Sequence, residues 1–492
     1  MVHGNPIMVG KIANDDTSLL AKVISGGALQ MIDLEREITD VRPYAMYQHS
    51  GVVTAQLPAA STIGAHAFAY CTNLASISFQ AATAIGSSAF QLCPAITYAE
   101  FPAATEIGAS AFYRCTGLRG ILFPEAQSIR AGAFGFCTEL MAAEFPKATT
   151  LEDGAFSACS NLETIHFPLV TAIGSNAFYL CSKLTEASFP RAGRVGDAAF
   201  RQCAGIAFAD LPVATRIGQQ AFMQCTGLTE VICSSVTLIE SSAFMSCFSL
   251  RTVTAPMVQS VRDYAFAKCA SLSTVAMPSC VSIGSAAFSE CYGLRTVSFP
   301  AAQELSYCAF AFCSSLSAVD FPAVITVGSS AFSGCTGLTT ASFPAATRVS
   351  DYAFSRCSAL TTAYFPAVTS IGYQAFYSCN VLTSLTLDSV QTIGSSAFEG
   401  CFSLSTLTLP NVTNIYYTAF SKCYYLVSLY LPGPIVASLY GSSVFSLTPI
   451  AGFSDLAGTV GSVFVPESLY AAYVTAYNWS YLSSRIVSIP SE

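Results

Sequence analysis

The chain has 492 residues and a formal net charge of −8, with only 10% charged residues and 52% hydrophobic ones. No basic cluster is present, which argues against nucleic-acid binding, because phosphate neutralisation needs grouped lysines and arginines. The longest charge-free stretch, residues 423–454, is interrupted by three prolines and three glycines, so we expect no membrane-spanning helix.

The first residues differ from the rest of the chain because they contain no repeat. We expect residues 1–36 to form an N-terminal cap or an attachment element that docks the protein to a partner. Residues 1–10 lack a basic stretch followed by a continuous apolar run, so no secretory signal is visible. Three explanations stay open: a signal that has been removed, another export route, or retention inside the cell.

From residue 67 to residue 423 the motif Ala-Phe-x-x-Cys occurs seventeen times, always 22 residues apart. A register this strict predicts stacked coils in which each coil buries its face on the next. Extending the register back by one unit gives a degenerate coil. In it Val41, Met46, His49 and Pro58 take the positions of the usual Ile, Phe, Cys and Pro.

Each unit contains two short extended segments. The segment 294–299 alternates, with Val297 and Phe299 on one side and Ser298 on the other, which predicts a strand ended by Pro300. The second extended segment of each unit is centred on an Ile or Val residue, which is often followed by Gly. The spacing of Phe288 and Cys291 favours a single helical turn between the two strands.

The units resemble the BspA-like (Treponema pallidum) class of leucine-rich repeats. The resemblance rests on Leu-x-x-Val-x-Phe-Pro followed by Ile-Gly-x-x-Ala-Phe-x-x-Cys, over about residues 41–432. It implies a right-handed solenoid of about eighteen coils with short parallel strands and single-turn helices, spanning residues 37–432. The chain departs from the class by using Phe where relatives often have Ile or Leu before Pro.

After residue 432 the register decays, and we expect residues 433–492 to form a C-terminal cap. The order there is a strand over 462–465, a helix opened by Pro466 and Glu467, and a final strand over 485–489. This segment is similar to the terminal unit of other BspA-like proteins. We expect the sole tryptophan, Trp479, to pack over the last coil rather than to bind a ligand.

Twenty cysteines are present, seventeen of them in the repeat position. Stacked cysteines about 5 Å apart lie within the Cα range of a disulfide, so a redox ladder is one interpretation. An odd column of seventeen cannot pair fully, and we expect buried, reduced thiols that act as small apolar residues. No Cys-x-x-Cys pair and no histidine pair has the spacing of metal ligands, so we expect neither a metal nor another cofactor.

No catalytic motif accompanies the repeat, so we expect no enzymatic activity. The informative positions face outward from the strands, ten residues after each anchor Phe. They change from acidic to hydroxyl-rich and aromatic along the chain. A ligand surface and an unselective solvated sheet face both explain this pattern. The candidate ligand-binding residues are Glu100, Glu144, His166, Asp210, Asp320, Tyr364 and Tyr430.

The sequence leads to two main hypotheses about function. The resemblance implies an adhesion scaffold that holds a protein or glycan ligand at a cell surface or outside the cell. The alternative is a structural or receptor-binding part of a larger assembly, such as a phage tail or prophage element, which would be virion-associated and needs no signal peptide. An intracellular interaction module is a third hypothesis.

Overall fold

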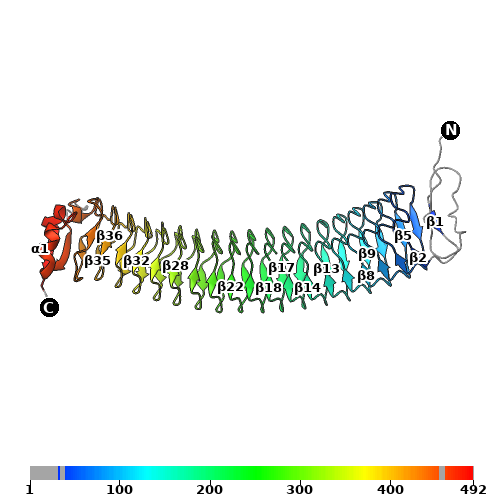
Figure 1. The fold of residues 1–492 in the computed structure, drawn as a ribbon, viewed down its shortest axis with the longest axis horizontal. Coiled ribbons are helices and arrows are strands. Elements are labelled where there is room, and N and C mark those ends of the chain that lie inside the picture. Colours follow the sequence, from blue (N-terminus) through cyan, green and yellow to red (C-terminus); the bar gives the residue numbers. More distant parts are fainter. Residues whose placement is uncertain (1–30, 34–38, 454–459, 491–492) are drawn as a thin grey trace, which may run out of the picture. The chain divides into compact units, whose positions relative to one another are not determined.

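The structure is a computed structural model that describes residues 31–33, 39–453 and 460–490. The chain divides into two compact units, Met1–Val236 and Thr237–Glu492. In each unit the chain winds into coils whose strands pair in parallel with those of the neighbouring coils (Figure 1). Each coil carries one three-residue strand and one two-residue strand, and within each unit equivalent strands lie 22 residues apart between residues 40 and 430.

The first unit contains two ladders. The three-residue strands are β1 (Met31–Asp33), β3 (Thr54–Gln56), β5 (Ser76–Ser78), β7 (Tyr98–Glu100), β9 (Gly120–Leu122), β11 (Ala142–Glu144), β13 (Thr164–His166), β15 (Glu186–Ser188), β17 (Phe208–Asp210) and β19 (Glu230–Ile232). The two-residue strands are β2 (Asp40–Val41), β4 (Thr62–Ile63), β6 (Ala84–Ile85), β8 (Glu106–Ile107), β10 (Ser128–Ile129), β12 (Thr150–Leu151), β14 (Ala172–Ile173), β16 (Arg194–Val195) and β18 (Arg216–Ile217).

The second unit repeats this arrangement. Its three-residue strands are β21 (Thr252–Thr254), β23 (Thr274–Ala276), β25 (Thr296–Ser298), β27 (Ala318–Asp320), β29 (Thr340–Ser342), β31 (Thr362–Tyr364), β33 (Ser384–Thr386), β35 (Thr406–Thr408) and β37 (Ser428–Tyr430). Its two-residue strands are β20 (Leu238–Ile239), β22 (Ser260–Val261), β24 (Ser282–Ile283), β26 (Glu304–Leu305), β28 (Thr326–Val327), β30 (Arg348–Val349), β32 (Ser370–Ile371), β34 (Thr392–Ile393), β36 (Asn414–Ile415) and β38 (Ser438–Leu439).

The predicted degenerate coil is confirmed at the start of the first unit. Val41 lies in β2, and Met46 is buried in the position of the anchor Phe, with its N–H donating to the Ala67 carbonyl at 2.6 Å. The expected cap of residues 1–36 lies outside the described residues except for β1, which pairs with β3. Its role in docking therefore stays a prediction.

Stacked phenylalanines form the core of both units. In the second unit Phe354 lies between Phe332 and Phe376, with ring centroids 5.3 and 5.2 Å apart and nearly parallel planes. The rings of Phe343 and Phe365 meet Phe354 edge-on. Stacked and edge-to-face contacts between rings each add about 0.5–1.5 kcal/mol to the gain from burial. The packing along the stack thus explains why the anchor Phe recurs without exception.

The cysteines form a second buried column, and all twenty are free. Each thiol that follows an anchor Phe points back one coil; Cys357, for example, donates to the carbonyl of Phe332 at 3.2 Å. Every cysteine except Cys308 is buried. The expectation of reduced thiols is confirmed, and the alternative of a disulfide ladder is wrong for this structure, because all twenty cysteines are free and repeat thiols such as that of Cys357 have a carbonyl partner.

A thiol-specific reagent should therefore distinguish the folded and unfolded chains. We expect about one thiol, that of Cys308, to react in the native protein and all twenty to react in denaturant. Counting thiols with Ellman's reagent before and after adding guanidinium measures this. Rapid reaction of many native thiols would contradict the buried column.

The expected single helical turn is replaced by a run of tight turns over the Ala-Phe-x-x-Cys segment, so that part of the prediction is corrected. Tyr352 and Arg356 have φ of 59° and 62°, in the left-handed region. Alternate N–H groups bond within the coil, as from Cys357 to Phe354, and to the next coil, as from Phe354 to Ala375. A helix would bond its N–H groups to carbonyls of its own segment, along the helix axis, and leave the neighbouring coil without these bonds.

The coils continue past residue 432, where we expected the C-terminal cap to begin. Strand β38 pairs with β36, and Phe445 stacks on Phe420 at 5.6 Å, so one more coil forms before the chain changes structure. Two added residues between β36 and β38 hide this coil from the 22-residue register. The short helix η1 (Pro449–Ala451) follows it.

The predicted terminal elements are confirmed as β39 (Ser462–Pro466), α1 (Glu467–Thr475) and β40 (Ile486–Ile489), with the short helix η2 (Ser480–Arg485) before the last strand. Trp479 is fully buried, as expected. Its Nε1 donates to the Ala437 carbonyl at 2.6 Å, and its ring lies against Phe445 and Tyr473. Trp479 therefore covers the apolar end of the last coil.

Candidate functional site

The three-residue strands form the candidate site, which we call the strand face. In β7 the side chain of Ala99 is buried, while Tyr98 is 48% exposed and Glu100 is half-buried. The first and third residues of each strand point outward because side chains alternate along a strand. Each coil therefore adds two outward side chains to the strand face, and the inward-facing middle residue, which is buried or half-buried, fixes their direction.

All the predicted ligand-binding residues lie on this face as the third residue of their strands. Those of the first unit are Glu100 in β7, Glu144 in β11, His166 in β13 and Asp210 in β17. Those of the second unit are Asp320 in β27, Tyr364 in β31 and Tyr430 in β37.

The structure brings only some of these residues together. Glu144 and His166 are direct neighbours in the β11–β13 register. Tyr430 instead stacks on Phe464 of β39, with ring centroids 4.5 Å apart, so it also packs against the terminal strand. Other candidates are separated by intervening coils, and the site is therefore an extended surface rather than a pocket.

Sequence reasoning missed the first residue of each strand, which shares the outward face with the third. Glu186, Phe208 and Glu230 are neighbours in the registers of β15, β17 and β19. Tyr98 packs its ring over Gly120 of the next coil, where an added Cβ would lie 2.8 Å from Tyr98 Cδ2. The period-two alternation of a strand was the signal that could have identified these positions.

The strand faces of the two units differ in charge. In the first unit the outward positions of β5 to β19 hold five carboxylates and no lysine or arginine: Glu100, Glu144, Glu186, Asp210 and Glu230. In the second unit the outward positions of β21 to β37 hold one carboxylate, Asp320, and are mostly serine and threonine. The acidic region predicted from the sequence is thus the strand face of the first unit, and the hydroxyl-rich region is the strand face of the second unit.

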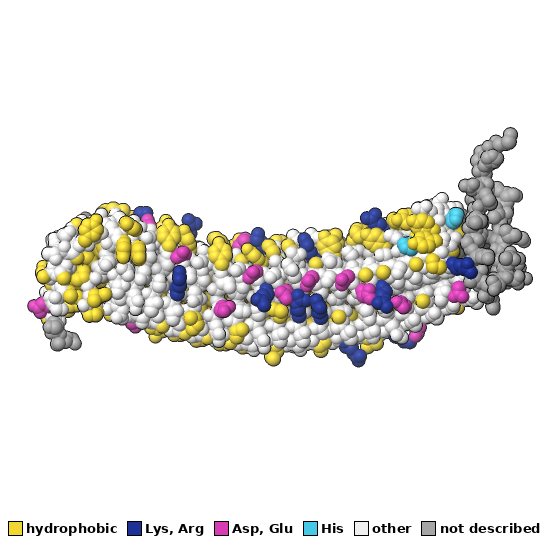
Figure 2. All heavy atoms as spheres, viewed as in Figure 1, with side chains coloured by type: hydrophobic (Ala, Val, Ile, Leu, Met, Phe, Trp, Pro, Cys, Tyr) yellow, Lys and Arg dark blue, Asp and Glu magenta, His cyan; other side chains and the backbone are white. Residues whose placement is uncertain are grey.

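Charged side chains in and directly after the two-residue strands have a different role, because they pair with each other. Arg130 lies between two acids, with Nε 3.0 Å from Glu106 Oε1 and Nη1 2.9 Å from Glu152 Oε1. The hydrogen bonds that Arg130 donates to Glu152 and Glu106 raise the pKa of its guanidinium group. Figure 2 shows acidic and basic side chains side by side on this face. Paired exposed charges contribute little to stability and offer little unsatisfied charge to a partner.

Several other polar groups also serve the coils themselves. Asp351 Oδ1 accepts from the backbone N–H of Tyr373 at 2.8 Å, and Asp263 does the same for Ser285 at 2.7 Å. Threonine hydroxyls such as that of Thr361 donate to the carbonyl 22 residues earlier. These side chains hold neighbouring coils in register and are not candidate ligand contacts.

No group of three or more His, Cys, Asp or Glu side chains among the described residues has the arrangement of a metal site. Within the same residues, no helix is both long and apolar enough to cross a membrane.

These observations define a class of protein, the parallel-stranded leucine-rich-repeat solenoid. The sequence matches the model of the BspA type leucine-rich repeat region over residues 17–119, 105–229, 193–317, 303–428 and 347–454. The chain belongs to this family. Proteins of this repeat class are typically binding scaffolds without catalytic activity. No curated protein matches the sequence.

Several solved structures are similar to this chain. A leucine-rich repeat protein from Bacteroides ovatus is 22% identical, with 83% of this chain and 88% of that chain covered and a TM-score of 0.45. A leucine rich cell surface protein from Faecalibacterium prausnitzii is 23% identical, with coverage of 67% and 83% and a TM-score of 0.30. The T. pallidum leucine rich repeat protein is 29% identical, with coverage of 34% and 72% and a TM-score of 0.28.

Proposed function

We propose that the protein is a non-enzymatic binding scaffold that presents its strand face to a protein or glycan ligand at a cell surface. The observation that carries this proposal is the contrast between the two sides of the strands. The middle residue is nearly always Ala, Val, Ile or Leu, whereas the outward residues range over Glu, Asp, His, Tyr, Phe, Ser and Thr. Packing inside the coil explains why the middle residue hardly varies. The variation of the outward residues, on a surface that the stacked coils hold in order, suits ligand recognition.

Membership of a family of binding scaffolds supports the same function. An ordered array of outward side chains on a stacked support also suits an extended ligand, because the coils hold the array without further ordering when the ligand binds. Within this proposal the carboxylates Glu100, Glu144 and Asp210 would contact donors on the ligand. Tyr364, which is 45% exposed, would supply an apolar contact with a hydroxyl at its end.

The test is a screen of purified protein on glycan and extracellular-matrix arrays, beside a variant with Glu100, Glu144, Asp210 and Asp320 changed to Ala. We expect the variant to bind the selected ligand at least about tenfold more weakly, since each lost charged contact removes a factor of several. Surface plasmon resonance on the array hits measures the change.

A matched control removes four acids from other faces by changing Glu125, Glu139, Glu290 and Glu304 to Ala. This control alters the net charge equally and should bind like the parent chain. Equal losses in both variants would show that only total charge matters. Binding that survives in the first variant would move the site off the strand face. Absence of binding to any array would favour a role in a larger assembly.

A further inference from the structure

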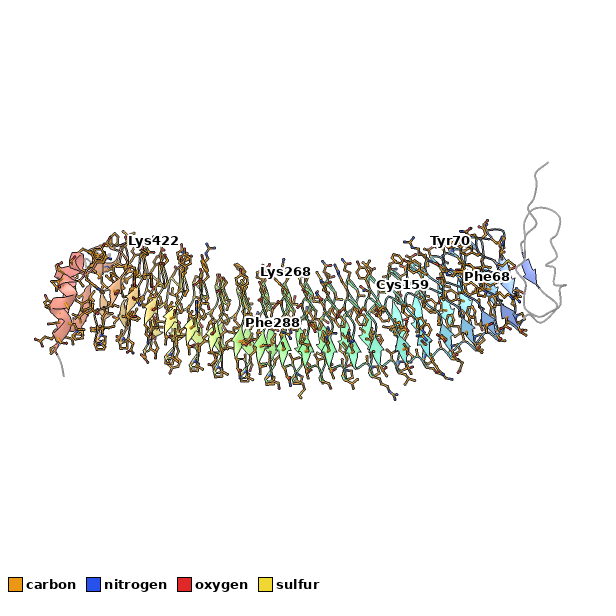
Figure 3. All side chains as sticks on the ribbon, in the orientation of Figure 1. Phe68, Tyr70, Cys159, Lys268, Phe288 and Lys422 are labelled. Carbon is orange, nitrogen blue, oxygen red and sulfur yellow. The ribbon has the colours of Figure 1, made fainter. Side chains whose placement is uncertain are left out.

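A second surface lies on the tight turns of the first unit, away from the strand face. Figure 3 labels Tyr70 on the edge formed by the turns, whereas Phe68, two residues earlier, lies inside the coil. Hydrophobic side chains gather along this edge near the N-terminal coils in Figure 2. We call this surface the aromatic ridge. It comprises Tyr44, Tyr47, His66, Tyr70, Leu92, Tyr113, Arg114 and Phe136.

The ridge is continuous over five neighbouring coils. The ring of Tyr44 stacks on His66 at 4.8 Å, and Tyr47 meets Tyr70 edge-on at 5.5 Å. Backbone bonds from Tyr70 to Gln91, from Leu92 to Tyr113 and from Arg114 to Gly135 join the following coils. The ridge ends where Ala158 takes the position held by Phe136 one coil earlier.

Large apolar side chains are costly at this position. Tyr70, Leu92 and Phe136 have φ of 63°, 57° and 60°, in the left-handed region that disfavours side chains by about 1 kcal/mol. Gly334 and Gly400 hold the equivalent position in two other coils, so the turn itself needs no side chain. Tyr70 and Phe136 are each 37% exposed as well. Strained and exposed aromatic residues at a position that accepts glycine point to recognition.

The aromatic ridge carries positive charge and no negative charge. Arg114 lies over the rings of Tyr113 and Phe136, 5.6 and 5.2 Å from their centroids. No ion pair to a described carboxylate involves Arg114. The turns that form the ridge, residues 43–48, 65–70, 87–92, 109–114 and 131–136, contain no Asp or Glu. The guanidinium group is therefore held in place with its donors available for an anion.

The arrangement of the rings favours a polypeptide over a ligand that stacks flat. His66 covers one face of Tyr44, and Arg114 approaches one face each of Tyr113 and Phe136, so less ring face than ring edge and hydroxyl is left for contact. The central parts of protein–protein interfaces are also rich in Tyr, Phe and Arg and poor in Asp and Glu, as the aromatic ridge is. We propose that the aromatic ridge binds an acidic polypeptide segment that carries apolar side chains beside its carboxylates.

The test uses fluorescent peptides on the full chain. Five coils about 4.8 Å apart span roughly 19 Å, which about six extended residues cover, so the probe is a peptide of about eight residues alternating Glu and Phe. Peptides alternating Lys and Phe, or Glu and Ser, are the probe controls. Fluorescence anisotropy should show binding of the Glu-Phe peptide alone, weakened about tenfold or more by Arg114→Ala.

The chain offers a matched pair of variants. Phe136→Gly removes a ridge ring, and Phe312→Gly makes the same change at the same position of a coil in the second unit, where φ is 62°. Both variants should fold at least as stably as the parent, because glycine adopts this conformation without strain. We expect only Phe136→Gly to weaken binding of the Glu-Phe peptide.

Four outcomes would overturn the proposal. The first is equal binding of the Lys-Phe peptide, and the second is equal loss in both glycine variants. The third is binding of an oligogalacturonate probe through Arg114 with no binding of the peptide, which would make the occupant a glycan. The fourth is a dimer in sedimentation that Phe136→Gly dissociates, which would make the occupant a second copy of this chain.

Discussion

Raising the pH from about 8 to about 10 is expected to unfold the protein, because the buried thiols must stay neutral in the folded state. Burial raises the pKa of the Cys115, Cys291 and Cys335 thiols from 9.0 to about 12. In the unfolded chain the thiols ionise near their ordinary pKa. The stabilisation from these thiols is therefore complete below about pH 9 and is lost as the pH rises from there toward 12.

The effect is large because many cysteines contribute. Each thiol with a raised pKa lowers the free energy of unfolding by about 1.4 kcal/mol per pH unit in this window. About five such thiols in one unfolding region would remove roughly 7 kcal/mol in one pH unit, which is comparable to the stability of a whole domain. The measurement is the urea midpoint of unfolding at a series of pH values from about 7 to about 10.

A single-site variant provides the control for this pH dependence. Cys335→Ser should reduce the slope by up to about 1.4 kcal/mol per pH unit, and by about half of that near pH 9, because serine does not ionise in this range. Midpoints that stay constant through this range would contradict the prediction. Urea midpoints measured below about pH 9.5 report on the thiols rather than on the tyrosines, because tyrosines ionise near pH 10.

Replacing Phe354 by alanine is expected to lower the free energy of unfolding by about 3–5 kcal/mol. Phe354 is fully buried, and its ring contacts four other phenylalanine rings with centroids between 5.2 and 5.8 Å away. Alanine leaves a cavity that neighbouring coils cannot close, because backbone hydrogen bonds between the coils fix their spacing. Chemical denaturation followed by circular dichroism measures the loss.

The comparison variant is Tyr364→Ala, an aromatic residue of the strand face in the same unit. Its side chain is 45% exposed, and we expect a change within about 0.5 kcal/mol. Similar losses for the two variants would mean that the phenylalanine column does not dominate the stability of the stack.

Much of the fold could be predicted because one spacing determines which residues face inward. The constant 22-residue register of Ala-Phe-x-x-Cys predicts the parallel stack, the burial of Phe and Cys and the degenerate first coil, and the structure confirms each of these. The terminal strand, helix and strand were predictable from Pro466 and Glu467, since proline and an acid commonly open a helix.

Other features depend on contacts that local sequence signals do not report. The left-handed residues of the turns include Tyr352, Arg356 and Phe136, so the glycine or asparagine that usually marks this conformation is absent from most of these positions. Bonds to the neighbouring coil stabilise the turn, and these exist only after stacking. The partnership of Tyr430 with Phe464 depends on β37 pairing with β39 across a 34-residue separation, so the sequence around Tyr430 could not reveal it.

The alternation of hydrogen bonds within and between coils has a genetic consequence. Phe354 donates to Ala375 as Phe332 donates to Ala353, so each coil offers the next one the same set of partners. Removing one complete unit of 22 residues joins two coils that already fit, whereas removing a number of residues that is not a multiple of 22 breaks the register. At the level of the gene, unequal recombination in steps of 66 nucleotides (22 × 3) would therefore yield folded proteins of different lengths. Variation in the number of coils is the change that this architecture tolerates most readily.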